Sequence, residues 1–122
     1  ERLELVFAFI GKKTIVNRSV TMDGLIKEAA EVLENSGVDD CCDAEIIMSV
    51  QKTIEHETAL YTTLCELAET LGIERAVALL QITLDAKIAA TIQLSEVALM
   101  VVNNYEFEEM QEDDESTTSF RR

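Results

Sequence analysis

The sequence predicts an all-α helical bundle, and three features of its composition lead to this prediction. The 122 residues include no proline and only four glycines, which favours long helices joined by short glycine turns. Hydrophobic residues make up 48% of the chain and aromatic residues only 5%, so the core is expected to be mostly aliphatic. A chain of this length is expected to form one domain with a modest core.

The first two helices follow from apolar residues that recur every three or four positions. Residues 1–10 carry such a face, and Gly11 is expected to end this helix. No capping residue precedes Glu1, so the segment is interpreted as the last turns of a longer helix. After a loop, a second helix is expected from Val20 to a turn at Gly37.

The next two helices are longer. The third is expected from about Asp43 to Leu71, with Asp40 or Asp43 as its N-terminal cap. Gly72 then separates it from a fourth helix, which is expected to run past Val102.

The end of the chain differs in composition. Residues 109–122 are acidic and rich in serine and threonine, which is typical of a flexible tail. The helical domain is therefore predicted to cover residues 1–108, and residues 109–122 to form an acidic flexible tail.

The charge and cysteine content of the chain make several classes of function unexpected. A net charge of -14 repels phosphate backbones, so nucleic acid is not an expected partner. No uninterrupted apolar run reaches the roughly 18 residues of a membrane span, and no membrane association is expected. The three cysteines are interpreted as reduced thiols in a cytoplasmic protein. Without a nucleophile–base pair or a glycine-rich phosphate loop, no catalytic residue is predicted.

The most informative stretch is TIEHETALYTTL, residues 53–64, which holds the chain's histidine between two glutamates. An α-helix turns by about 100° per residue, so these neighbours cannot share a face. Glu57 and Tyr61 fall on the apolar side, Glu55 lies nearly opposite, and His56 lies at the margin. A carboxylate in an apolar stripe is costly unless it is paired, protonated or bound to a metal. The alternative is that Glu57 reaches past the core to water.

Lys87 holds the matching position in the fourth helix, at the centre of an apolar face. The two longest helices thus each carry one charge in an apolar stripe, with opposite signs. If these helices pack together, Glu57 and Lys87 are expected to meet, with Tyr61 or Thr91 as hydrogen-bonding neighbours. In the alternative, Lys87 extends its stem to the surface and leaves Glu57 free to bind a cation.

The fourth helix is also apolar outside this face. A helix that is hydrophobic on most sides is normally covered on most sides, so a subunit interface is expected. The sequence therefore predicts a homodimer or a larger homo-oligomer. The outer apolar residues are Ile82, Ile88, Ile92, Leu99 and Met100.

Three segments resemble the ferritin-like YciE/YciF family of bacterial stress-associated proteins. They are VTMDGLIKEAAEVLENS, VQKTIEHETALYTTLCELAETLG and LLQITLDAKIAATIQLSEVA, and the likeness runs from about Glu1 to Ala98. The resemblance implies a ferritin-like, four-helix-bundle-type domain that commonly dimerises. It also implies that the first helix and most of the second lie upstream of Glu1.

The resemblance further implies a two-metal carboxylate site, which binds iron or manganese where it survives. Glu57 matches an inward glutamate of the family, and Tyr61 matches a family tyrosine. His56 lies one residue away from the family's Glu-His pair, so it is a weaker candidate ligand. On the last helix Asp85 keeps one acid of the family's acidic stretch, whereas Lys87 stands at an inward acidic position.

Two functions remain open from the sequence. In the first, the metal site is degraded, no cofactor binds, and the chain is a structural or interaction module associated with stress. In the second, Glu57, His56 and Asp85 join upstream residues as ligands of a functional di-iron protein in oxidative-stress or iron chemistry. A protonated lysine cannot bind a metal and opposes a nearby cation, so Lys87 favours the first.

Overall fold

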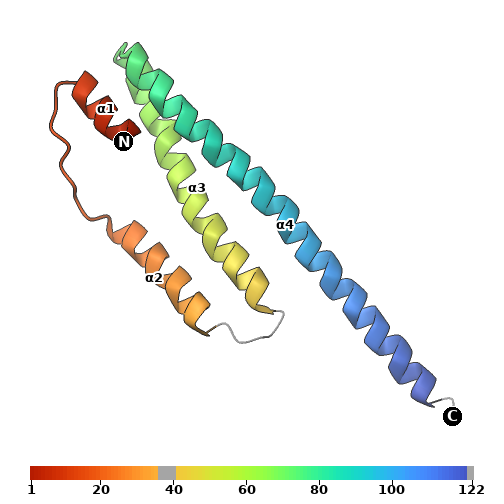
Figure 1. Cartoon of the computed structure of the whole chain (residues 1–122). Coiled ribbons are helices and arrows are strands. Elements are labelled where there is room, and N and C mark those ends of the chain that lie inside the picture. The colour runs from red at the N-terminus through yellow and green to blue at the C-terminus, as the bar shows by residue number, and fades with distance from the viewer. Residues whose placement is uncertain (36–40, 121–122) are drawn as a thin grey trace.

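The computed structural model describes residues 1–35 and 41–120 and contains four helices, with no strand in that part of the chain (Figure 1). The all-α prediction is confirmed. The helices are α1 (Arg2–Phe9), α2 (Val20–Asn35), α3 (Cys41–Thr70) and α4 (Glu74–Phe120).

The helices are arranged around one antiparallel hairpin. α3 and α4 pack along each other, α2 packs against α3, and α1 packs against α4 near its start (Figure 1). The C-terminal part of α4 extends beyond the ends of the other helices (Figure 1). The seam between α3 and α4 therefore brings the two predicted charge-bearing faces together.

Glycine turns end α1 and α3 as predicted. Gly11 and Gly72 both have φ of 69°, the left-handed conformation that glycine adopts without a steric penalty. After α3, the amide of Gly72 donates to the carbonyl of Glu69 and the amide of Ile73 to that of Ala68, both at 3.0 Å. These are the two hydrogen bonds of a Schellman motif, and they satisfy carbonyls that the helix end would otherwise leave unpaired.

The helix starts differ in part from the prediction. α2 is capped by Ser19, whose Oγ accepts a hydrogen bond from the amide of Met22 at 3.2 Å. α3 begins at Cys41, so Asp43 lies in its first turn and is not its cap. The proposed Asp40 cap and the Gly37 turn lie outside the described residues.

The chain end, predicted to be an acidic flexible tail, is helical as far as Phe120. α4 continues without a break through residues 109–120. No glycine follows Gly72 and the chain has no proline, while glutamate, glutamine and methionine in this segment are good helix formers. Composition indicated an exposed segment but did not reveal that nothing in it ends a helix. Its independent mobility remains a prediction.

The buried core is small and lies at the closed end of the hairpin. It consists of Cys65, Ala68, Ala76, Leu80 and Leu84, with Val6, Tyr61, Ile73 and Val77 packed against it. Many large apolar side chains remain exposed, including several along α4. By length and composition alone, α4 is also apolar enough to span a membrane, a test that core helices of soluble proteins pass as well.

Candidate functional site

The candidate site is the polar part of the α3–α4 seam, where Lys87 and Glu57 form an ion pair between Nζ and Oε2. The two residues that the sequence predicted to meet are therefore in contact. The side chains are 30% and 26% exposed, so the pair is half-buried at the edge of the seam and is not enclosed in the core. The helices described cover Glu57 only in part, and its place inside a complete core remains a prediction.

The antiparallel packing of α3 and α4 places this pair one helical turn from a second polar group. Tyr61 follows Glu57 by four residues in α3, and Thr83 precedes Lys87 by four residues in α4. Tyr61 packs against the core cluster. The Thr91 hydroxyl donates to the carbonyl of Lys87 at 3.0 Å, so it does not donate to Glu57 as anticipated. Among the described residues, Tyr61 makes no hydrogen bond to Glu57.

The other residues of the TIEHETALYTTL stretch lie where the helical periodicity predicts. Glu55 is exposed and His56 is half-buried at the margin of α3, whereas Glu57 is less exposed than Glu55. The three side chains therefore do not form one cluster, in agreement with the face assignment.

Asp85 lies on a different face of α4 from Lys87. It is exposed, and its Oδ1 accepts a hydrogen bond from Nε2 of Gln81, one turn earlier in the same helix, at 2.8 Å. Within residues 1–35 and 41–120, no three or more histidine, cysteine, aspartate or glutamate side chains form a group suited to hold a metal ion. Glu57, His56 and Asp85 are thus not brought together as a ligand set.

These residues do not fit the two-metal site that the resemblance implies. The carboxylate of Glu57 faces the ammonium of Lys87, and a cation placed there would be opposed by that charge. Thr91, one turn after Lys87 in α4, offers a neutral hydroxyl that is hydrogen-bonded to the backbone. No reaction through a metal follows from the residues of this chain.

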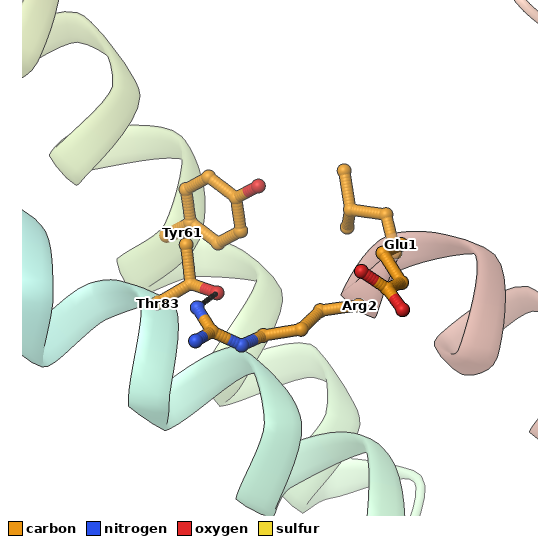
Figure 2. A pocket seen from close by; sticks show the side chains of 5 residues that line it. Glu1, Arg2, Tyr61 and Thr83 are labelled. Atoms are coloured by element: carbon orange, nitrogen blue, oxygen red, sulfur yellow. Dashed lines mark hydrogen bonds between the residues drawn. The ribbon is translucent and has the colours of Figure 1, made fainter.

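A polar pocket of about 330 Å³ lies at the next turn of the seam (Figure 2). It is lined by Glu1, Arg2, Leu3, Tyr61 and Thr83. Nη1 of Arg2 donates a hydrogen bond to Oγ1 of Thr83 at 3.2 Å, which joins α1 to α4. The sequence did not reveal this pocket, because the side of α1 that meets α4 depends on tertiary packing.

Cys65 is the titratable group that burial affects most clearly. Its thiol is 4% exposed, and burial raises its pKa, with further increases from the charges of Glu69, Asp85 and Glu66. A raised pKa keeps the thiol protonated and unreactive at neutral pH. Cys65 is therefore interpreted as a small residue of the core.

Comparison with known proteins identifies the family. Residues 1–106 match the family described as Domain of unknown function (DUF892). The chain is 42% identical to protein YciF of Escherichia coli K12 over 86 residues, which cover 70% of this chain and 52% of that protein. The crystal structure of the E. coli stress protein YciF matches with a TM-score of 0.77 and 38% identity. That match covers 84% of this chain and 65% of the crystallised one.

The chain thus spans about half the length of the curated relative it matches. Its helices are arranged as in the crystallised E. coli protein, and the description of the matched family gives no function. The chain belongs to the DUF892 family.

Proposed function

We propose that this chain is a stress-associated structural or interaction module in which the Glu57–Lys87 ion pair replaces the charge of a metal. The observation that supports the proposal is the contact itself: an ammonium lies against the carboxylate that matches the family's inward glutamate. An ion pair neutralises a half-buried carboxylate as a bound cation would. The helices α3 and α4 can therefore pack together at this position without a metal ion. The association with stress is supported by the similarity to the E. coli stress protein YciF.

The module is proposed to act in the cytoplasm as a homodimer or a larger homo-oligomer. Support comes from the small core and from the outer face of α4, where Ile82, Ile88 and Ile92 are 51%, 44% and 57% exposed. Exposed apolar side chains that share one side of a helix are typical of a protein–protein interface. A second copy of the chain would bury that surface and enlarge the core.

The charge-replacement proposal is tested by thermal unfolding of the Lys87→Glu variant with and without Mn²⁺ or Fe²⁺. Without metal, two facing carboxylates should lower the melting temperature, because like charges in a half-buried seam repel. Addition of Mn²⁺ or Fe²⁺ should raise the melting temperature again, because a metal that binds only the folded state stabilises it. A variant with wild-type stability and no response to metal would count against charge replacement.

A functional di-iron protein is the competing proposal. It requires wild-type protein to bind iron despite Lys87, with ligands from sequence beyond this chain. The same titration on wild-type protein separates the two, because a di-iron protein gains stability from Fe²⁺ with Lys87 in place.

A further inference from the structure

Another pocket lies at the closed end of the hairpin, where α3 turns into α4. Its volume is about 480 Å³, and none of its residues belongs to α1. Helical geometry places its α4 residues on a different side of that helix from Arg75 and Thr83, which contact α1. We call it the turn pocket, and the residues that line it are Glu69, Gly72, Ile73, Glu74, Val77, Ala78 and Gln81.

The charged groups of the turn pocket are both negative. Glu69 of α3 and Glu74 of α4 line it, and within the described residues neither carboxylate forms an ion pair. The neighbouring cation, Arg75, lies with its guanidinium carbon 5.5 Å from the centre of the Phe9 ring, on the side of α1. Glu69 also lies in the last turn of α3, where the helix dipole adds partial negative charge. The turn pocket therefore favours a cation.

The third polar side chain of the turn pocket, Gln81, adds an acceptor. Its Nε2 donates a hydrogen bond to Oδ1 of Asp85 at 2.8 Å, which leaves its side-chain oxygen to accept. With the carboxylates of Glu69 and Glu74, three side chains of the pocket thus supply acceptor oxygens. An ammonium group carries three N–H donors and no acceptor, so its hydrogen-bonding capacity matches this set.

The remaining side chains of the turn pocket are aliphatic. They belong to Ile73, Val77 and Ala78, and the first two also pack against the buried core, which holds them in place. Hydrocarbon that lies against such a surface is removed from water, which favours binding. The pocket is therefore better suited to a cation with a hydrocarbon body than to a bare metal ion.

We propose that the turn pocket binds a small organic amine in its protonated form. The ammonium group donates to the oxygens of Glu69, Glu74 and Gln81, and the hydrocarbon part lies on the aliphatic side chains. Because the net charge of -14 attracts any cation to the protein, a test must separate binding in the pocket from this general attraction.

The test is an NMR titration of the ¹⁵N-labelled chain with hexylamine at neutral pH, where the amine is protonated. The amide signals of Val77 and Ala78 should shift. Glu69→Gln and Glu74→Gln should each weaken binding about threefold, the contribution of one exposed ion pair. Glu55→Gln removes the same charge from an exposed position of α3, about 21 Å along the helix from Glu69, and should bind as wild type does.

Two ligands and two variants complete the test. Hexanoate has the same hydrocarbon with the opposite charge, and ethylamine has the same charge with less hydrocarbon, so both should shift these amides far less. Ala78→Leu fills the pocket without a change of charge and should weaken hexylamine binding. Ala86→Leu, at an exposed position of α4 outside the pocket, should not. Far-UV circular dichroism should stay unchanged in both variants, because alanine and leucine are both good helix formers.

The same titration is repeated on the chain together with any sequence that precedes Glu1 in its gene, and hexylamine binding should persist there. The proposal is overturned if Glu69→Gln and Glu55→Gln weaken binding equally, because the overall charge alone would then attract the amine. Equal shifts from hexylamine and hexanoate, shifts that bypass Val77 and Ala78, or loss of binding in the longer form would overturn it as well.

Discussion

Lys87 of α4 forms an ion pair with Glu57 of α3, and both residues lie at the centre of otherwise apolar helical stripes. The resemblance to the YciE/YciF family places an acidic residue where Lys87 stands. A positive charge from the protein itself therefore lies beside a carboxylate that the resemblance assigns to a metal site. The consequences of this pair can be measured separately for stability and for metal binding.

Loss of the Lys87 charge should destabilise the fold. In Lys87→Met the side chain keeps its apolar stem, and Glu57 is left without a partner in a half-buried position. The expected loss is about 1–3 kcal/mol, between the values for exposed and for buried pairs. Urea unfolding at one fixed protein concentration measures it.

Lys52 offers the matched control, because its pair with Glu28 is more exposed, at 52% and 47%. Lys52→Met should cost less than about 1 kcal/mol. If Lys87→Met and Lys52→Met lose equal free energies of unfolding, the position of the Lys87–Glu57 pair in the seam does not increase its contribution to stability.

Alanine substitutions at Gly72 and Gly24 should change stability in opposite directions. Gly72 has a φ of 69°, so Gly72→Ala should lose about 1–2 kcal/mol through backbone strain alone, since an added Cβ meets no atom within 4 Å. Gly24 lies inside α2 with the same free space, so Gly24→Ala should gain about 0.5–1 kcal/mol from helix propensity. Chemical unfolding of both variants gives the sign of each change in unfolding free energy. Stabilisation by Gly72→Ala would contradict the turn assigned to Gly72.

Burial of Cys65 predicts a pH dependence of stability. Because burial raises the thiol pKa in the folded state, the unfolded chain loses this proton first once the pH exceeds about 9.0. The free energy of unfolding should then fall as pH rises through this range, while below it the thiol contributes no pH dependence. The difference between wild type and Cys65→Ala, measured from pH 8 to 10, isolates the contribution of this group from that of the lysines. A constant difference would contradict the assigned burial.

Assembly should depend on the outer face of α4. Ile92 is 57% exposed in the single chain, and Ile92→Asp should shift the protein toward monomer, because a charge in an apolar interface cannot be desolvated cheaply. Sedimentation velocity at micromolar concentrations measures this shift. Thr62→Asp introduces the same group at an exposed position of α3, away from the outer face of α4, and should leave the assembly intact. A wild-type protein that sediments as a stable monomer would contradict the proposed interface.

Much of the fold could be predicted because local rules determine it. The apolar periodicity located the four helices, and Gly11 and Gly72 ended two of them through a conformation that glycine favours. The extent of α4 was missed, because acidic composition indicates exposure but does not stop a helix. The capping role of Ser19 was missed too, although a serine just before a helical face is a recognisable signal.

The site was only partly predictable for a different reason. Helical periodicity placed Glu57 and Lys87 on facing stripes, and antiparallel packing then brings them into contact. The pocket at Arg2 depends on how the short helix α1 packs onto α4, and no local pattern encodes that packing. Likewise, the position of Asp85 beside Gln81 follows from its own face of α4 and not from the acidic motif it belongs to.

The most direct measurement of the central claim is the metal content of the purified wild-type protein. The protein is produced in iron- and manganese-supplemented medium, both as this chain and with any sequence that precedes Glu1 in its gene, and metal is quantified by mass spectrometry after gel filtration. If Lys87 takes the place of a metal charge beside Glu57, both wild-type forms should retain far less than one ion per chain, and Lys87→Glu should retain more than wild type. Wild-type protein carrying about two iron or manganese ions per chain, as an intact two-metal carboxylate site does, would contradict the account.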